Sequence, residues 1–363
     1  MTATPLGRHL CDLIATQGPL TMARFMAEAL GHPEHGYYMT RDPFGAAGDF
    51  ITAPEISQMF GELIGAWCAD VWMQMGAPAG LHLVELGPGR GTLMKDALRA
   101  THRVPGFRDA LTLHLVETSR RLRDVQAKTL EGQAVAWHDS VTDVPAGPTI
   151  VIANELFDAL PVHQFQFRQG QWHERLIDVA PDSEDLRLVL DPSPAHRARL
   201  DHFARPQEGA IAEICPAGVS LAEYLATRVA RETGAALIID YGHTEPGFGD
   251  TVQGVRAHKM HSILETPGTI DLCAHVDFAA LADVADKNST ATWGPVSQHD
   301  FLRQLGIDER AAALSAASPT DATDIASAVH RLTHPDEMGT LFKVLAFSSA
   351  NLHPAGFDLR DSI

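Results

Sequence analysis

The sequence predicts an α/β protein, in which a doubly wound, Rossmann-like sheet follows an N-terminal helical cap and carries an inserted antiparallel hairpin. Three observations predict it. Short apolar runs alternate with helical stretches from about residue 80 onward. A glycine-rich turn, GPGRG, directly follows the first of these runs. The 363 residues are 45% hydrophobic, enough to build the core of one large domain or two.

The first 80 residues are predicted to be mostly helical. Apolar residues recur at three- and four-residue spacing over 8–16 and 21–30, and Thr21 can cap the second segment. A loop rich in Gly, Pro and His follows, and then a long helix over 54–75. We therefore expect residues 1–79 to form a helical cap and loop.

Strands and crossover helices are predicted to alternate after residue 80. The expected strands cover 81–86, 111–116, 134–137 and 149–153, and the expected helices cover 92–100 and 119–130. The strands are continuously apolar, as in a parallel sheet covered on both faces. Residues 80–363 are thus predicted to form one Rossmann-like domain.

An insertion at about 161–214 is expected to interrupt this alternation. VHQFQF and QWHERLIDV flank Gln169-Gly170, which predicts an antiparallel hairpin added to the parallel core. The polar segment 181–210 is predicted to be a helix with connections. A helix over 220–232 and a strand over 235–240 then resume the alternation. The last third, 276–363, is expected to be mainly helical with a strand at 341–347.

Composition excludes several classes of partner. Lys+Arg 28 against Asp+Glu 46 gives a net charge of −18, which phosphate backbones and anionic membranes repel, so no nucleic-acid partner is expected. Four scattered cysteines without a C-x-x-C pair exclude a zinc ribbon and a disulfide scaffold and favour a reducing compartment. Neither a signal peptide nor an apolar run of about 18 residues is found. The prediction is a cytoplasmic protein without membrane insertion.

The glycine turn narrows the choice of ligand. Strand LHLVEL runs into GPGRGTL, and Gly87, Gly89 and Gly91 let a ligand approach the backbone near a helix N-terminus. A dinucleotide fingerprint would need glycine at position 92, which is Thr92. No Lys-Ser/Thr pair follows the glycines, so the turn is not a P-loop either.

Acids stand at the carboxyl ends of three successive predicted strands. Glu85 would repel a pyrophosphate but attract the ammonium and sulfonium groups of S-adenosyl-L-methionine. Glu117 lies where carboxylates accept ribose hydroxyls, and Asp139 lies where an adenine amino group would arrive. Each has a simpler alternative, since Glu85 could be an ordinary strand end and Glu117 could cap the helix near Ser119. With the glycine spacing, the acids predict an S-adenosyl-L-methionine site.

Longer blocks resemble one family. ELGPGRGTL resembles motif I of class I S-adenosylmethionine-dependent methyltransferases. HPEHGYY, GDFITAPEISQMFGELIGAW, ANELFDALPV, LIIDYG, DLCAHVDF and MGTLFKVLAF resemble the MidA-like branch, from near the start of the chain to near its end. The resemblance implies a seven-stranded methyltransferase sheet with a family-specific cap and a protein-arginine acceptor on a respiratory complex I type partner. Gly48 and Asp49, in the second block, are predicted cofactor contacts.

The block NELFDALPV provides the candidate catalytic residues. It follows strand TIVIA, which places Asn154 and Glu155 beside the cofactor crevice at the carboxyl edge of the sheet. Methyl transfer to a guanidinium needs a carboxylate to orient a planar cation whose pKa is too high for free deprotonation. Glu155 is the first candidate and Asp158 the second, and the alternative for both is capping and loop structure. Asp49 and Glu55 reach the same crevice if the cap folds over it.

Other functions remain open from the sequence alone. A small-molecule methyltransferase is the first rival, and a non-catalytic assembly factor that keeps the cofactor fold is the second. A nicotinamide-dependent reductase is the third, opposed by Glu85 and Thr92. A metal site at Asp271, His275 and Asp277 is not expected, because ligands two residues apart on irregular backbone are poorly spaced and Asp277 can cap a helix.

Overall fold

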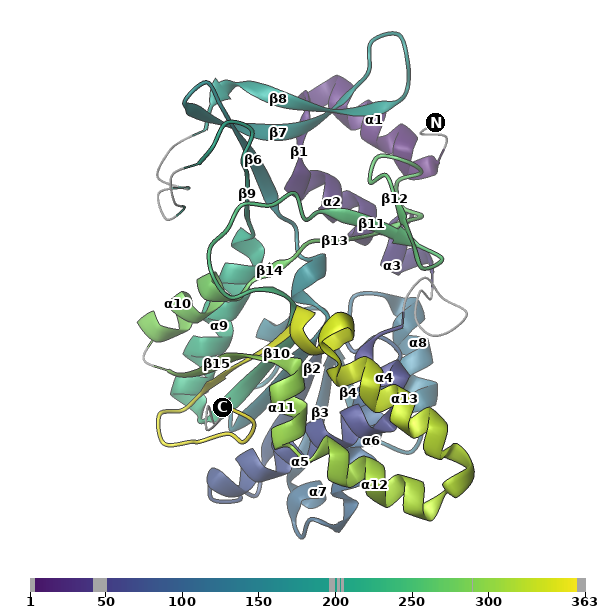
Figure 1. The fold of residues 1–363 in the computed structure, drawn as a ribbon, viewed down its shortest axis with the longest axis vertical. Helices are drawn as coiled ribbons and strands as arrows, with labels where there is room; N and C mark the ends of the chain where they lie inside the picture. The colour runs from purple at the N-terminus through teal and green to yellow at the C-terminus, as the bar shows by residue number, and fades with distance from the viewer. Residues whose placement is uncertain are drawn as a thin grey trace. The chain divides into compact units, whose positions relative to one another are not determined.

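The computed structural model describes residues 4–41, 51–195, 200, 203, 206–288 and 290–357. Gly48 and Asp49 lie outside the described residues. The chain forms two compact units (Figure 1). The sheet unit comprises Ile51–Leu156, Leu221–Gly242 and Ala280–Ile363, and the antiparallel unit comprises Met1–Phe50, Phe157–Ser220 and His243–Ala279. Within the described ranges, no helix has the length and apolar character needed to cross a membrane.

Seven described strands of the sheet unit follow the order β15-β16-β10-β5-β2-β3-β4. Their bounds are β2 Leu81–Leu86, β3 Leu111–Val116, β4 Val135–His138, β5 Thr149–Asn154, β10 Gly234–His243, β15 Ala291–Ser297 and β16 Phe342–Ser348. The pairs from β10 to β4 are parallel, whereas β16 pairs antiparallel with both β10 and β15. The predicted doubly wound sheet is confirmed, and β15 is a strand that the sequence analysis missed.

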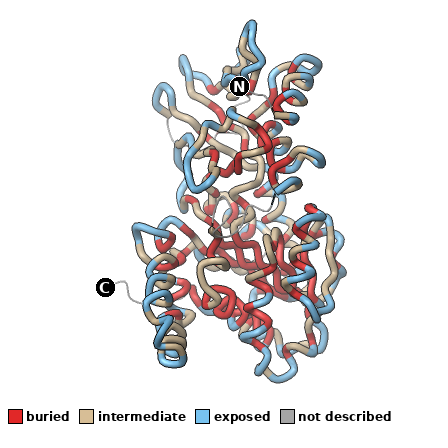
Figure 2. Tube along the Cα trace, turned by 90° about the vertical axis from the view of Figure 1, so that its right-hand side faces the viewer, coloured by how far each residue is buried: buried red, intermediate tan, exposed pale blue. Residues whose placement is uncertain are grey.

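The sheet is buried on both faces, as its uniformly apolar strands predicted. Alternate residues Leu81, Leu83 and Ile150, Ile152 belong to one large core. Figure 2 shows the strands of this sheet largely in red, the colour of buried residues. The helices of this unit, or partly of it, are α4 Ala53–Ile56, α5 Gln58–Gln74, α6 Thr92–Ala100, α7 Phe107–Ala110, α8 Arg120–Thr129, α9 Pro216–Glu232, α10 Phe278–Lys287, α11 Gln298–Gln304, α12 Ile307–Ala317 and α13 Ala322–Thr333.

The helix expected over 54–75 is broken, so that prediction is wrong in one respect. Ser57 is extended, with φ −158° and ψ 139°, and separates α4 from α5. Its hydroxyl accepts a hydrogen bond from the backbone N–H of Met59 at 3.2 Å and so caps α5. Residues 51–79, expected in an N-terminal cap, include α4 and α5 of the sheet unit. The domain boundary at residue 80 stays a prediction.

Helices α5 and α6 pack at unusually short range because two glycines of α5 face α6. A Cβ on Gly61 would lie 2.8 Å from the Cβ of Asp96, and a Cβ on Gly65 would lie 2.6 Å from the Cα of Ala97. Such distances are far below van der Waals contact, so any side chain at Gly65 would push the helices apart. The FGELIG segment therefore fixes the depth at which α6 lies against α5.

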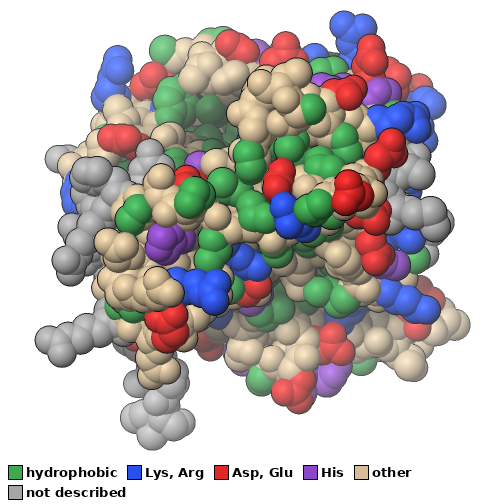
Figure 3. Space-filling view, turned by 90° about the horizontal axis from the view of Figure 1, so that it is seen from above, with side chains coloured by type: hydrophobic (Ala, Val, Ile, Leu, Met, Phe, Trp, Pro, Cys, Tyr) green, Lys and Arg blue, Asp and Glu red, His purple; other side chains and the backbone are tan. Residues whose placement is uncertain are grey.

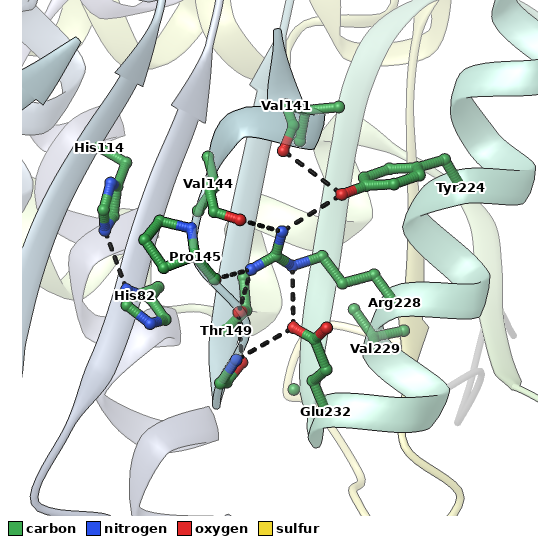
Figure 4. Close-up of polar contacts among 12 residues, drawn as sticks. His82, His114, Val141, Val144, Pro145, Thr149, Tyr224, Arg228, Val229 and Glu232 are labelled. Atoms are coloured by element: carbon green, nitrogen blue, oxygen red, sulfur yellow. Dashed lines mark hydrogen bonds and ion pairs between the residues drawn. The ribbon is translucent and has the colours of Figure 1, made fainter. Parts of the chain in front are cut away.

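A buried arginine joins α9 to the amino edge of the sheet (Figure 4). Arg228 donates hydrogen bonds to the carbonyl oxygens of Val144, at 3.1 Å, and Pro145, and to the hydroxyl of Thr149, at 3.3 Å. Its Nε also pairs with Glu232 at 3.3 Å. The guanidinium therefore stabilises the entry into β5, away from the carboxyl edge on which the candidate site lies.

Three histidines form a hydrogen-bonded row across β2, β3 and β4, and Figure 4 shows the first two. Nδ1 of His82 lies 2.9 Å from Nε2 of His114, and Nδ1 of His114 lies 2.9 Å from Nε2 of His138. Burial, assisted by His82, His138 and Arg228, lowers the pKa of His114 to about 4. The central ring is therefore neutral near pH 7.

The antiparallel unit contains the predicted hairpin in a sheet of its own. Its elements are α1 Pro5–Gln17, β1 Leu20–Thr21, α2 Met22–Gly31, α3 Tyr37–Thr40, β6 His163–Arg168, β7 Gln171–Val179, β8 Leu186–Pro194, β9 Ile211–Ile214, β11 Gln253–Arg256, β12 Lys259–His261, β13 Asp271–Cys273 and β14 Val276–Asp277. One sheet has the order β1-β7-β6-β9 with β8 beside β7, and another has the order β12-β11-β13. The β6–β7 hairpin is confirmed.

Two expectations about this region are wrong. The hairpin is not added to the parallel core, because β6 and β7 pair with β9, β1 and β8 instead. The expected helix with connections over 181–210 is wrong for the first part of the segment that the structure describes, because that part forms strand β8. Leu186, Leu188 and Leu190 alternate with other residues along β8 and pair with β7. The segment forms a strand because it pairs with β7. Its polar composition made this strand hard to predict from the sequence.

Candidate active site

The glycine turn has the geometry that its residues predict. Gly87, Gly89 and Gly91 have φ of 60°, 52° and 81°, in the left-handed region that residues with a Cβ rarely adopt. The N–H of Gly87 donates to the carbonyl oxygen of Val116 at 3.0 Å, and the carbonyl of Gly91 accepts from Lys95 in the first turn of α6 at 3.1 Å. The turn thus places three residues without side chains between the carboxyl end of β2 and the start of α6.

Glu85 is a buried acid just before the turn. It is 3% exposed, and the backbone N–H of Met94 donates to its carboxylate. Burial raises its pKa to about 8, and its Oε2 has no hydrogen-bond partner among the described residues. A cationic ligand at this edge would relieve both effects. The residues present therefore fit a ligand that carries ammonium and sulfonium groups.

Glu117 is held from both sides at the end of β3. Its Oε1 accepts from the backbone N–H of Ser119 at 2.7 Å, and its Oε2 accepts from Nε2 of Gln126 at 3.3 Å. Ser119 is the N-cap of α8, so Glu117 does not cap the helix itself, as the structural alternative had it, but accepts from the N–H of the cap residue. Burial raises the pKa of Glu117. Sequence reasoning missed Gln126.

Asp139 has a partner that sequence reasoning did not foresee. It follows β4, as predicted, and its side chain is 80% exposed. One oxygen, Oδ1, pairs with Nη2 of Arg123 at 2.6 Å. Arg123 also donates to the carbonyl oxygen of Glu117 at 2.7 Å. The arginine therefore joins the ends of β3 and β4, where the ribose and adenine were expected.

Asn154 and Glu155 lie at the end of β5 as predicted. Oε1 of Glu155 accepts from the backbone N–H of Ala53 at 2.8 Å and from Nδ2 of Asn154 at 3.1 Å. Glu155 has φ 51°, a conformation that costs energy for a residue with a side chain and that occurs preferentially at functional sites. Oδ1 of Asn154 is buried and has no hydrogen-bond partner among the described residues.

The short helix α4 connects this corner to the glycine turn. Its first residue, Ala53, is held by Glu155, and Oε1 of Glu55 accepts from the hydroxyl of Thr92 at 2.5 Å. Thr92 is the first residue of α6. The residue type that ruled out a dinucleotide fingerprint thus has a positive role, because it ties α6 to α4. No spacing in the sequence could have revealed this pair.

Asp158, the second catalytic candidate, belongs to the antiparallel unit. It lies in the short 3-10 helix Phe157–Ala159, and its carbonyl oxygen accepts from the N–H of Ala274 at 2.9 Å. The hydroxyl of Tyr38 donates to Asp271 at 2.9 Å. Burial raises the pKa of Tyr38, and the charges of Asp271 and Asp158 raise it further. Asp158 therefore interacts with Ala274 and Tyr38, which belong to the same unit.

One described group of side chains has the composition of a metal site. Ligand atoms of His9, Glu28 and His32 all lie within 4.8 Å of one another. However, Nδ1 of His32 accepts from the backbone N–H groups of Glu34 and His35, both at 3.2 Å. The neutral ring then carries its proton on Nε2 and offers no free lone pair to an ion. The group is better described as a hydrogen-bonded helix end.

The strand order, the glycine turn after β2 and the acids at the ends of β2 and β3 define a class I methyltransferase. The chain belongs to the family described as putative S-adenosyl-L-methionine-dependent methyltransferases, whose model matches residues 63–296. It is therefore a methyltransferase that uses S-adenosyl-L-methionine, as the sequence predicted. The resemblance to the MidA-like branch is confirmed.

Relatives and solved structures agree with this assignment. The chain is 38% identical over 361 residues to the Danio rerio protein arginine methyltransferase NDUFAF7, mitochondrial, covering 93% of this chain and 85% of that protein. The Homo sapiens relative of the same name is 39% identical over 377 residues, covering 94% and 83%. A COG1565 superfamily member from Burkholderia thailandensis, bound to S-adenosyl-homocysteine, has a TM-score of 0.86 and 28% identity, covering 98% of this chain and 94% of that one.

These names overturn one prediction. The relatives are named mitochondrial, so the prediction of a cytoplasmic protein is wrong. That prediction rested on scattered cysteines and on a start of the given sequence without the pattern of a secretory signal peptide, and mitochondrial proteins can share both features.

Proposed function

We propose that this methyltransferase transfers the methyl group of S-adenosyl-L-methionine to an arginine side chain of a protein, and that the protein is a subunit of a respiratory complex I type partner. The name of the relatives, protein arginine methyltransferase, supports the arginine acceptor. The observation that carries the proposal is Glu155, a carboxylate fixed at the end of β5 in a left-handed conformation. The partner rests on the resemblance to the MidA-like branch.

The cofactor site that we propose lies at the carboxyl edge of the large sheet. The glycine turn, with Glu85, Glu117, Asp139 and Asn154, forms its described part, and Gly48 and Asp49 remain further candidates. Glu85 and Asn154 support this placement, because each has a buried oxygen that accepts no hydrogen bond from the residues that the structure describes. Oδ1 of Asp139 pairs with Arg123, and the side chain is otherwise exposed. The bound cofactor supplies a methyl group activated by a sulfonium.

The catalytic role that we propose for Glu155 is to orient the guanidinium and stabilise its charge. A guanidinium presents its donors in a planar fork that a fixed carboxylate can match. Glu155 is fixed by its own N–H, which donates to Ile239 at 2.9 Å, and by the bonds from Ala53 and Asn154. Asp158 is the second candidate. The alternative is that Glu155 only anchors α4.

The test compares two substitutions of Glu155. Glu155→Gln keeps the oxygen that accepts from Ala53 but removes the charge, and Glu155→Ala removes both. We expect Glu155→Gln to bind S-adenosyl-L-methionine within about threefold of the wild type and to lose about 100-fold or more in methyl transfer. Glu155→Ala should lose transfer and also bind the cofactor more weakly, because α4 loses its anchor. Normal turnover by Glu155→Gln would transfer the acceptor role to Asp158, Asp49 or Glu55.

The acceptor is tested with labelled S-adenosyl-L-methionine, wild-type protein and lysate, followed by mass spectrometry of the labelled product. Methylated arginine in a complex I subunit supports the proposal. A label on lysine or on a small metabolite contradicts the arginine acceptor and favours a small-molecule or other methyltransferase. A wild-type protein that binds the cofactor but transfers no label to any acceptor would contradict catalysis and favour a non-catalytic assembly factor.

A further inference from the structure

Gln126 is a buried side chain whose amide group bonds two parts of the proposed cofactor site and a tryptophan on β4. It lies on α8 and is 0% exposed. Its Nε2 donates to the carbonyl oxygen of Gly89 at 2.9 Å and to Oε2 of Glu117 at 3.3 Å. Its Oε1 accepts from the indole N–H of Trp137 at 2.9 Å. One amide therefore joins the glycine turn, the acid at the end of β3 and the strand β4.

Trp137 decides which way the amide points. An indole N–H only donates, so it holds Oε1 of Gln126. The NH₂ group is then directed at Gly89 and Glu117, both of which present acceptors. The three contacts leave the amide no alternative orientation. If the amide were flipped, its oxygen would face the acceptors of Gly89 and Glu117, and its NH₂ group would face the indole N–H of Trp137. The hydrogen bonds of Gln126 therefore fix the orientation of its side-chain amide.

Gln126 also lies directly beneath the turn. A Cβ on Gly91 would lie 3.6 Å from both Cα and Cγ of Gln126. The residue therefore supports the turn by packing at Gly91 and by hydrogen bonding at Gly89. A glutamine that only stabilised α8 would not need contacts to two glycines of a neighbouring loop.

We infer that Gln126 is a positioning residue for the methyl donor: it fixes the Gly89 carbonyl and the second oxygen of Glu117 so that the turn and the ribose-binding carboxylate are aligned before the cofactor arrives. The inference rests on the proposed cofactor site at the glycine turn. Because a site held in its binding geometry binds more tightly, loss of the amide should lower affinity without touching the ligand directly.

The test measures two ligands, S-adenosyl-homocysteine and its 2′-deoxyribose analogue, by calorimetry. The wild type should prefer the natural ribose, because Glu117 accepts from its hydroxyl groups. Gln126→Met keeps the length of the side chain and removes its hydrogen bonds. We expect it to bind S-adenosyl-homocysteine at least about tenfold more weakly and to discriminate less between the two ligands, because Glu117 is no longer held.

A matched control separates positioning from general destabilisation. Leu122→Ala changes a buried residue of the same helix whose side chain takes no part in this hydrogen-bond network. It should lower the melting temperature but keep the wild-type preference between the two ligands. If Gln126→Met kept that preference too, or bound within about twofold of the wild type, the inference would be overturned. If Gln126→Met does not fold, Trp137→Phe replaces it, and a reduced preference is again expected.

A further variant distinguishes this inference from the proposed site on which it rests. Gly89→Val places a side chain where the ligand would meet the backbone and should abolish binding. Wild-type affinity of Gly89→Val would refute the site at the turn, and the role of Gln126 with it. Loss of binding in Gly89→Val with an unchanged preference in Gln126→Met would refute the role of Gln126 alone.

Discussion

Glu85 has a buried carboxylate whose Oε2 accepts no hydrogen bond from the described part of the chain. One N–H bond, from Met94, does not offset burial at 3% exposure, and the pKa of Glu85 therefore rises to about 8. In an unfolded chain the same carboxyl group loses its proton near pH 4.5. Between these values the folded protein holds a proton that the unfolded chain has lost, so stability falls as pH rises.

Glu85→Gln should therefore stabilise the ligand-free protein by an amount that grows with pH. The difference in free energy of unfolding between variant and wild type should increase from pH 5 to pH 8 by at most about 1.4 kcal/mol per pH unit, and level off above pH 8. Urea titrations at three pH values measure it. Glu131→Gln, at an exposed position of the same unit, should show little change. A difference that is constant across the range would mean that Glu85 is charged in the folded protein.

At the scale of single residues, sequence patterns predicted the features that depend on residues close together in the chain. Glycine spacing predicted the turn, and the strand ends predicted Glu85 and Glu117. The side chains that hold these groups were missed, because Gln126, Arg123 and Thr92 act through contacts between separate elements. Their residue types are common in any helix, so nothing local in the sequence marks them.

At the scale of secondary-structure elements, the close approach of α5 and α6 at Gly65 allows a prediction. A Cβ at this position would lie 2.6 Å from the Cα of Ala97, so α6 must shift to accept it. We expect Gly65→Ala to lower the free energy of unfolding by about 1–3 kcal/mol, as overpacked cores do. It should also weaken cofactor binding, because α6 begins at Thr92, directly after the glycine turn. Thermal melts and calorimetry measure the two effects.

Gly80→Ala is the matched control for Gly65→Ala. A Cβ at Gly80 meets no atom within 4 Å, so stability and affinity should both stay near the wild type. Equal effects of the two substitutions would show that backbone freedom, rather than the approach of α6 to α5, explains the loss.

The histidine row across the sheet predicts sensitivity to acid. The pKa of His114 falls from an ordinary 6.5 to about 4 because the ring is buried beside two other histidines and Arg228. Below pH 6.5 the unfolded chain takes up a proton that the folded protein refuses, so stability falls as pH falls toward 4. The expected loss is about 1.4 kcal/mol per pH unit, or about 3 kcal/mol in all.

The acid effect is measured by comparing the wild type with His114→Gln. The variant should lose less stability between pH 7 and pH 5, because the glutamine side chain does not titrate in either the folded or the unfolded state. His330→Gln, at an exposed position on α13, should follow the wild type. If His114→Gln and the wild type lost stability in parallel, other groups would account for the acid sensitivity.

The elements themselves were predicted unevenly, for a physical reason. Strands β2 and β3 and helix α6 begin and end where their apolar runs or periods do, because burial of those residues in the core determines these elements. Strand β15 depends on β16, which lies far away in the sequence. Strand β8 pairs with the preceding strand β7, and its polar and charged residues hide the strand pattern. The break at Ser57 depends on a hydroxyl that accepts a hydrogen bond from the backbone N–H of Met59, and apolar periodicity alone does not reveal such a bond.

At the scale of the whole molecule, the net charge of −18 predicts that binding of the proposed acceptor depends on salt concentration. Acidic and basic side chains are mixed on the face that Figure 3 shows, but the excess of acid over the whole chain attracts a basic partner. The KM for an arginine-containing protein acceptor should rise several-fold between about 0.05 and 0.5 M salt. The affinity for S-adenosyl-homocysteine should change much less, because buried groups are screened less.

Steady-state kinetics at a range of salt concentrations, with cofactor binding measured in parallel, tests this expectation. Sodium chloride and potassium chloride should act alike, since screening depends on ionic strength. A KM that is indifferent to salt would mean that apolar contacts rather than charge guide the acceptor.

The place of β16 in the sheet has a consequence for protein synthesis. Phe342–Ser348 lies between β10 and β15, although both of these strands precede it in the chain. While the ribosome is still translating residues before Phe342, the growing chain has an open edge on β10 and a strand, β15, without its neighbour. Such unpaired edges attract other strands. The sheet therefore keeps an unpaired edge at β10 until Phe342–Ser348 has been synthesised and can pair there.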